Sequence, residues 1–263
     1  MRAMTTDTEQ ADPVLVERDG RIQIITLNRP DARNAVNQAL AEGVARALDE
    51  LDADDDLSVG VVTGAGGGFC AGMDLKAFVK GEVPYVGDRG FAGITQRGSS
   101  KPLIAAVEGF AVAGGLEVAL ACDLIVAGRS AKLGIPEVKR SLVAAGGALL
   151  RLPRRLPEGV AMELALTGDP ISAERGHEFG LVNRLADDGA ALETALELAR
   201  AVAANGPLAL KATKAVMLER HAWPEEEFWE RQGELTGPVF ASEDAREGAT
   251  AFAEKRQPEW KGR

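Results

Sequence analysis

Residues 109–128 form an almost uninterrupted apolar run that is about long enough to span a bilayer. Glu117 and Asp123 lie inside this run, and the pair Gly114 and Gly115 interrupts it. Charged side chains are costly in the middle of a membrane-spanning helix. The run therefore predicts a buried strand, a tight turn and a helix inside the core of a protein that does not cross a membrane.

Strand patterns alternate with helical patterns along the chain. β-branched residues indicate strands over residues 21–28 and 57–63, and apolar residues three or four apart indicate a helix over residues 36–51. This alternation predicts an α/β fold with helices covering a sheet, whereas residues 81–100 are irregular enough to predict a mobile loop. Further predicted elements are strands over residues 101–107, 122–127 and 131–134 and helices over residues 159–166, 172–180, 190–204 and 207–221.

Composition excludes several classes of protein. With 263 residues, of which 46% are hydrophobic, the chain can bury one sizeable core. A formal net charge of -10 argues against nucleic-acid binding and against attachment to anionic membranes. Two cysteines without zinc spacing, and no secretory signal ahead of them, predict a cytoplasmic protein without disulfides. Residues 1–12 are polar and are expected to be a disordered tail.

Glu117 and Glu137 each follow a glycine-bearing, mostly apolar turn, which is an unusual place for a carboxylate. An ionised carboxylate out of water is costly unless it is paired or hydrogen-bonded. A carboxylate with a perturbed pKa in a cleft is a candidate acid or base. Two of them suggest proton transfer to a small substrate.

Two turns near these glutamates are candidates for presenting backbone amides. Gly72 permits an unusual backbone angle, and Asp74 can cap a helix that begins at Leu75. The Met73 amide would then be an exposed donor at the start of that helix. The turn at Gly114 offers a second donor, and amides aimed in this way stabilise oxyanions.

Other polar residues favour structural roles. Asp123 is expected to form hydrogen bonds behind a strand, and Glu108 is expected to bond the backbone of a turn. His177 and His221 have no partner at the spacing of a zinc site or a Ser-His-Asp triad. The glycine-rich residues 63–69 lack a phosphate-binding fingerprint.

A series of stretches resembles the crotonase (enoyl-CoA hydratase/isomerase) superfamily in order and spacing. They are residues 27–35, 69–75, 107–117, 120–123, 133–137, 166–168 and 180–183. The resemblance implies a spiral of ββα turns over residues 13–200. It also implies a C-terminal helical region over residues 201–263 that mediates assembly into a homotrimer or a hexamer (a dimer of trimers).

The resemblance also implies a reaction. The expected enzyme is a lyase of the enoyl-CoA hydratase type, which adds water reversibly across the 2,3 double bond of an acyl-CoA thioester. No metal is implied, and no cofactor beyond the coenzyme A of the substrate. The oxyanion-hole amides fall on Met73 and Gly114, the base that activates water falls on Glu117, and the acid that protonates C2 falls on Glu137. The alternatives are a delta-isomerase or a carnitinyl-CoA dehydratase-like enzyme of the same fold, and a non-catalytic acyl-CoA-binding protein.

Residues around these positions are expected to bind the acyl-CoA. In relatives, a Phe and a Lys of the last helix reach a neighbour's coenzyme A, which points to Phe252 and Lys255. One departure from the family pattern is Ala145, which stands where hydratases usually have glycine. The full set of expected substrate contacts is Arg29, Arg33, Ala35, Ala71, Asp74, Leu75, Lys76, Phe252 and Lys255.

Overall fold

The computed structural model describes residues 12–263. The tail predicted over residues 1–12 therefore lies outside the described residues, except for Asp12. No helix in the described part of the chain is long and apolar enough to cross a membrane. The apolar run at residues 109–128 folds as the strand β7 (Phe110–Val112), the helix α3 (Gly114–Ala121) and the strand β8 (Leu124–Gly128). The predicted strand, turn and helix are confirmed.

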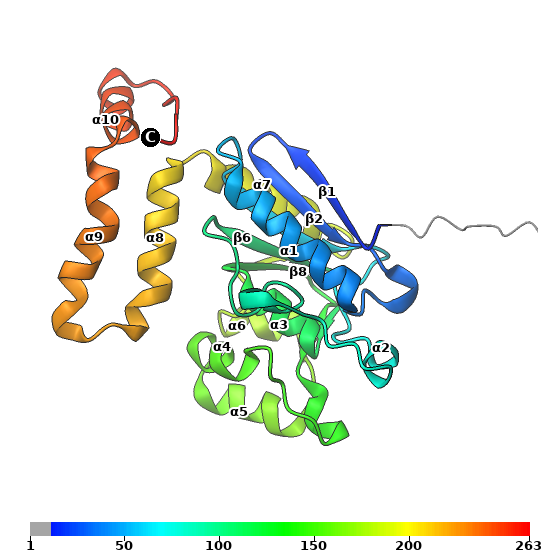
Figure 1. Ribbon diagram of the computed structural model, residues 1–263. Helices are drawn as coiled ribbons and strands as arrows, with labels where there is room; N and C mark the ends of the chain where they lie inside the picture. Colours follow the sequence, from blue (N-terminus) through cyan, green and yellow to red (C-terminus); the bar gives the residue numbers. More distant parts are fainter. Residues whose placement is uncertain (1–11) are drawn as a thin grey trace, which may run out of the picture.

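A six-stranded sheet forms the main layer of the protein (Figure 1). β1 and β2 make an antiparallel hairpin, and every later neighbour in the sheet is parallel. The α/β prediction is confirmed, although the edge strand β1 was not predicted. In spatial order the strands are β1 (Val14–Asp19), β2 (Ile22–Leu27), β3 (Val59–Gly64), β6 (Leu103–Val107), β8 and β11 (Arg184–Ala186).

Both faces of this sheet are buried because side chains alternate between two apolar clusters. Ile22, Val59 and Ile104 point toward one face, which packs against α7 (Ala191–Ala203). Ile25 and Leu103 belong to the cluster on the other face, where α1 and α3 pack. The helix predicted over residues 36–51 is α1, Gln38–Ala53. The parallel strands are therefore a fixed core on which the remaining segments are placed.

A second, smaller sheet lies beside the first. It pairs β10 (Ile171–Ser172) antiparallel with β9 (Lys132–Gly134), and β9 parallel with β7. Cys70 adds an isolated parallel bridge to Ala111 of β7. The segment at Cys70, β7 and β9 therefore run in the same direction, and the residues that follow them meet at one edge.

Short helices surround this edge, and a C-terminal arm stands beside the layered body (Figure 1). The arm consists of α8 (Pro207–Glu219), α9 (Phe228–Ala241) and α10 (Glu243–Glu254), joined by the 3-10 turns η4 (Arg220–Ala222) and η5 (Glu225–Glu227). The helices at the edge are η1 (Pro30–Ala32), α2 (Leu75–Val79), η3 (Pro136–Arg140), α4 (Ala148–Arg155), α5 (Glu158–Thr167) and α6 (Ala173–Glu178).

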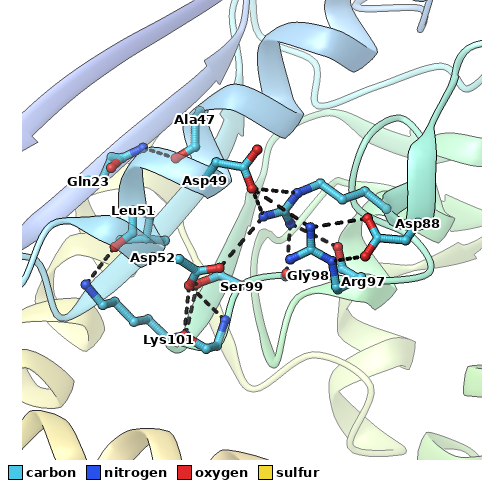
Figure 2. Close-up of polar contacts among 12 residues, drawn as sticks. Gln23, Ala47, Asp49, Leu51, Asp52, Asp88, Arg97, Gly98, Ser99 and Lys101 are labelled. Atoms are coloured by element: carbon cyan, nitrogen blue, oxygen red, sulfur yellow. Dashed lines mark hydrogen bonds and ion pairs between the residues drawn. The ribbon is translucent and has the colours of Figure 1, made fainter.

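Residues 84–99, predicted as part of a mobile loop, are instead anchored to α1. They contain β4 (Tyr85–Val86), η2 (Gly87–Arg89) and β5 (Gly90–Phe91). Arg89 is 2% exposed, and its side chain donates to Asp49 of α1 at 3.2 Å and to the carbonyl of Gly98 at 2.8 Å. Figure 2 shows Asp49 and Asp52 facing this segment, and the Ser99 hydroxyl donates to Asp52 at 2.6 Å. A buried arginine held by carboxylates fixes this segment in place.

Candidate active site

Three parallel segments bring the predicted site residues together. The amide of Val112 donates to the carbonyl of Cys70 at 3.1 Å, and the amide of Ala113 donates to the carbonyl of Gly134 at 2.9 Å. Met73 follows the first segment, α3 with Glu117 follows the second, and η3 with Glu137 follows the third. Residues far apart in sequence therefore meet at the ends of paired strands.

The amides of Met73 and Gly114 lie at two turns in close contact. Gly72 has φ +93°, and a Cβ at that position would lie 2.9 Å from the Gly114 nitrogen. Glycine is thus required there by conformation and by space. Within residues 12–263, neither the Met73 amide nor the Gly114 amide donates a hydrogen bond to a protein acceptor. Two adjacent donors of this kind can bind an oxyanion.

Asp74 is held by two kinds of partner. Its carboxylate caps α2 by accepting from the amides of Lys76 at 3.0 Å and Ala77 at 3.2 Å, as predicted. The Arg29 guanidinium pairs with it at 3.0 Å. Burial by itself would raise the pKa of Asp74, but these amides and Arg29 lower it below its usual value. The pairing gives Arg29 and Asp74 a structural role beside Met73.

Glu117 is a buried carboxylate on the first turn of α3, with 4% of its surface exposed. Its Oε1 accepts from the amide of Ala148 at 3.1 Å, which is the first helical residue of α4 and therefore a donor without an intrahelical partner. Gly146 packs directly on the carboxylate, because a Cβ there would lie 2.5 Å from Oε2. Burial raises the pKa of Glu117, and the amides of Ala148 and Gly146 and the charge of Arg151 oppose that rise.

Glu137 lies on η3 and has different surroundings. Its Oε2 is buried and has no hydrogen-bond partner among the described residues. Burial raises the pKa of Glu137, and the nearby Glu117 carboxylate raises it further, whereas the backbone amide of Glu137 itself and Arg140 act in the opposite direction. Glu137 also lines an apolar cavity of about 360 Å³ between η3, α4 and α5. Its aliphatic lining includes Val138, Leu149, Met162 and Leu166.

The predicted contacts in the first part of the chain gather near Met73. The amide of Ala71 donates to the carbonyl of Arg33 at 3.1 Å. The Arg33 guanidinium stacks over the Phe110 ring, 4.3 Å from its centroid. Arg29 donates to the carbonyl of Ala35. Leu75 and Lys76 are exposed on α2, so Lys76 is an accessible cation at this edge.

The structure does not bring Phe252 and Lys255 to the site within one chain. Both belong to α10 or its end, and the C-terminal arm lies apart from α3 in Figure 1. Phe252 is 88% exposed, and Lys255 ends α10 in the left-handed conformation. A contact between these residues and a site would require a second chain.

Polar residues that were given structural roles have structural contacts. Asp123 accepts from the amide of Leu103 at 2.7 Å and pairs with Lys214 at 2.7 Å. Glu108 accepts from the amide of Ala191 at 2.7 Å. Between residues 12 and 263, no group of three or more His, Cys, Asp or Glu is arranged to hold a metal ion.

Several residues of the site were not predicted. The Phe91 ring lies over Gly114, since a Cβ on Gly114 would come within 2.6 Å of it, and Tyr85 packs edge-on against Phe91 at 5.9 Å. Gly146 and the Ala148 amide hold Glu117. For Gly146 and the Ala148 amide, the available signal was the glycine pair at 146–147 directly before an amphipathic helix, because such a pair leaves helix N-terminal amides accessible.

Ala145, the expected departure from the family pattern, sits in a relaxed backbone conformation. Its side chain is exposed and its φ is negative, so alanine fits there without strain. The close packing on Glu117 falls on the next residue, Gly146.

Comparisons with known proteins agree along nearly the full length. The chain matches the family described as Enoyl-CoA hydratase/isomerase over residues 17–263. An enoyl-CoA hydratase of Mycobacterium tuberculosis is 45% identical over 262 residues, covering 97% of this chain and 98% of the relative. A carnitinyl-CoA dehydratase of Salmonella heidelberg is 42% identical over 254 residues, covering 94% and 97%. The crystal structure of an enoyl-CoA hydratase from Mycobacterium marinum aligns with a TM-score of 0.94 at 59% identity, covering 96% of this chain and 100% of that one.

Proposed function

The chain belongs to the enoyl-CoA hydratase/isomerase family, and we propose that it adds water reversibly across the 2,3 double bond of a 2-enoyl-CoA thioester. One observation supports this most strongly. Two amides without acceptors among the described residues, and two carboxylates with raised pKa values, follow three paired strand segments that end at one edge. Amides suit a thioester oxygen that gains negative charge. Carboxylates whose pKa is raised suit proton transfer near neutral pH.

In the proposed reaction, residues of this chain accept and donate every proton that moves. Glu117 takes a proton from water as the water oxygen bonds to C3. The electron pair of the double bond moves toward the thioester oxygen, where the amides of Met73 and Gly114 stabilise the enolate-like charge. The enolate then collapses by taking a proton from Glu137 at C2. We propose no metal and no cofactor beyond the coenzyme A of the substrate.

We also propose that the enzyme assembles through its C-terminal arm into a homotrimer or a dimer of trimers. The arm exposes large apolar side chains, including Trp229 at 76% and Phe240 at 82%, and exposed apolar groups of this size are typical of interfaces. Assembly would let Phe252 and Lys255 reach the coenzyme A of a neighbouring chain. Light scattering tests this, and the mass of a single chain would contradict it.

We place the enzyme in the cytoplasm. Cys70 and Cys122 are buried, unpaired thiols, which suits a reducing compartment. Lys76 on α2 is the accessible cation nearest in sequence to Met73, and we propose that it contacts a phosphate of coenzyme A.

The test of the reaction is loss of the conjugated enoyl-thioester absorbance with short, medium and branched acyl groups. We expect turnover and a 3-hydroxyacyl product. Movement of the double bond without water uptake would identify a delta-isomerase instead. Tight binding of every thioester without turnover would identify an acyl-CoA-binding protein.

A carnitinyl-CoA dehydratase-like activity is the second candidate, and the similarity to such an enzyme favours it. The cavity beside Glu137 argues against it. The described lining of this cavity contains no aromatic residue that would bind a quaternary ammonium, so the cavity favours an uncharged acyl group. Glu158 is the one other ionisable residue of that lining. An enoyl-CoA with a γ-trimethylammonium group should therefore give a lower kcat/KM than its aliphatic analogue of equal length.

A further inference from the structure

Arg151 is a partly buried cation of α4 that takes no part in the mechanism above. Its guanidinium donates to the carbonyl of Thr95 at 2.6 Å and to the carbonyl of Gly146 at 3.4 Å. It also lies against Gly147, because a Cβ there would come within 2.1 Å of Nη1. The planar guanidinium therefore joins two separate backbone segments, the loop before α4 and the segment that follows β5.

Both of these segments hold parts of the candidate active site. The loop before α4 packs Gly146 on the Glu117 carboxylate and aims the Ala148 amide at its Oε1. The segment at Thr95 belongs to residues 84–99, which carry the Phe91 ring over Gly114. Movement of Arg151 would consequently disturb the base and the oxyanion donor together.

The charge of Arg151 also acts on Glu117. Its charge favours the ionised form of Glu117 and opposes the effect of burial on the pKa of that carboxyl. From other elements, Glu137 of η3 and Tyr85 of β4 face Glu117, and neither supplies a positive charge. Burial lowers the pKa of Arg151. The charges of Arg155 and Arg154 on the same helix lower it further, whereas Glu117 and Cys122 raise it. Arginine stays protonated under this pressure, because its ordinary pKa is far above neutral.

We propose that Arg151 is a positioning residue that holds residues 146–148, and through them the Glu117 carboxylate, in the geometry in which Glu117 accepts a proton from water. The proposal rests on the hydratase function proposed above. Arg151 touches no reacting atom and acts through Glu117 and the loop.

Two substitutions separate its geometric and electrostatic effects. Arg151→Gln removes the charge and the fork of donors, and Arg151→Lys keeps the charge but loses the paired geometry. In Arg151→Gln we expect kcat to fall by about tenfold or more, the size typical of a misplaced catalytic group, with little change in KM. We also expect the acidic limb of kcat/KM to move to higher pH, because Glu117 then ionises less readily. In Arg151→Lys that limb should stay in place and part of kcat should return.

Arg154→Gln is the matched control, since it removes an exposed charge from the same helix. It should leave both kcat and the acidic limb unchanged. The proposal is overturned if Arg151→Gln keeps the acidic limb in place, or if Arg151→Lys shifts it as far as Arg151→Gln does.

A readout without turnover keeps this inference apart from the hydratase assignment. The carbon NMR titration of labelled glutamate carboxyls, with Glu117 assigned by Glu117→Gln, should show Glu117 titrating at higher pH in Arg151→Gln than in the wild type. An unchanged titration overturns the inference even if the wild type is an active hydratase. Absence of wild-type turnover refutes the hydratase, whereas a shifted titration still supports the role of Arg151. Should the Gln variant fail to fold, the same titration of Arg151→Lys must retain the wild-type position, and a shift there counts against the proposal.

Discussion

The loop before α4, which packs on Glu117, and the cavity beside Glu137 differ in how well they stabilise a negative charge. The start of α4 supplies the Ala148 amide at 3.1 Å, and Arg151 of the same helix adds a positive charge that acts on Glu117. The cavity supplies aliphatic side chains, and the buried Oε2 of Glu137 has no partner among the described residues. Burial raises the pKa of both carboxyls. The amides of Ala148 and Gly146 and the charge of Arg151 stabilise the ionised form of Glu117, whereas for Glu137 its own backbone amide and Arg140 are opposed by the charge of Glu117.

This difference supports the two proposed roles on physical grounds. A base must be ionised before the reaction, which suits Glu117 and its donors. An acid must hold a proton, which suits Glu137, where the charged form gains little and also faces the charge of Glu117. Because the two carboxyls interact, their protons leave as a coupled pair.

The largest expected effect follows removal of either carboxylate. Glu117→Gln and Glu137→Gln should each lower kcat by about 100-fold or more, the range expected for loss of a general acid or base. Steady-state hydration of an enoyl-CoA measures this. Glu163→Gln, on the exposed face of α5, is a control that should retain full activity. Near-normal hydration by one of the two active-site variants would break the two-carboxylate mechanism.

A smaller change at the loop tests whether close packing fixes Glu117. In Gly146→Ala the new Cβ would lie 2.5 Å from Oε2 of Glu117, so the carboxylate must move. We expect kcat to fall by about tenfold, as for a displaced catalytic group, while KM changes little. Gly159→Ala in α5 is the control, since nothing lies within 4 Å of a Cβ there. Wild-type kcat in Gly146→Ala would show that the loop does not position the base.

The pH profile of the reaction tests the difference between the two carboxyls. Activity should rise with pH as Glu117 ionises and fall as Glu137 loses its proton, which gives a bell. Burial places both transitions above 4.5, the ordinary pKa of a glutamate. In Glu137→Gln the residual activity should keep the acidic limb and lose the alkaline one. An acidic limb at 4.5 in the wild type would contradict the raised pKa of Glu117.

The parts of the site that follow strands could be predicted from sequence, because local signals mark them. Glycines at tight turns, a capping aspartate and charges at the ends of apolar runs pointed to Met73, Gly114, Glu117 and Glu137. The same reasoning explains the missed edge strand β1, most of whose side chains are exposed, so it lacks an apolar pattern.

The supporting residues could not be predicted, because they act across long separations. Arg151 reaches Thr95, 56 residues away, and Arg89 reaches Asp49, 40 residues away. No periodicity encodes such contacts, and each side chain by itself looks like an ordinary surface charge. Phe252 and Lys255 were predicted from the family resemblance alone, and their contact stays a prediction, since the proposed partner is another chain.

The smallest expected effect concerns a third carboxylate, Asp74, whose pKa is shifted in the opposite direction to that of Glu137. Its cap and its pair with Arg29 hold its pKa below the usual value, so its ionised form stabilises the fold. Asp74→Ala should therefore cost about 1 kcal/mol of unfolding free energy at neutral pH. That difference should shrink as pH falls through the lowered pKa of the folded state. Asp74→Asn keeps an acceptor for the cap and should cost less.

Glu137→Gln should change the unfolding free energy in the opposite direction. A carboxyl whose pKa is raised on folding loses stability as pH rises through that value, so the neutral amide should leave the fold as stable as the wild type or more stable at pH 7. Urea unfolding of both variants across pH measures the two trends. Parallel pH trends in Asp74→Ala and Glu137→Gln would mean that the carboxyl surroundings do not differ as described, and that the acid cannot be told from a structural carboxylate by its burial.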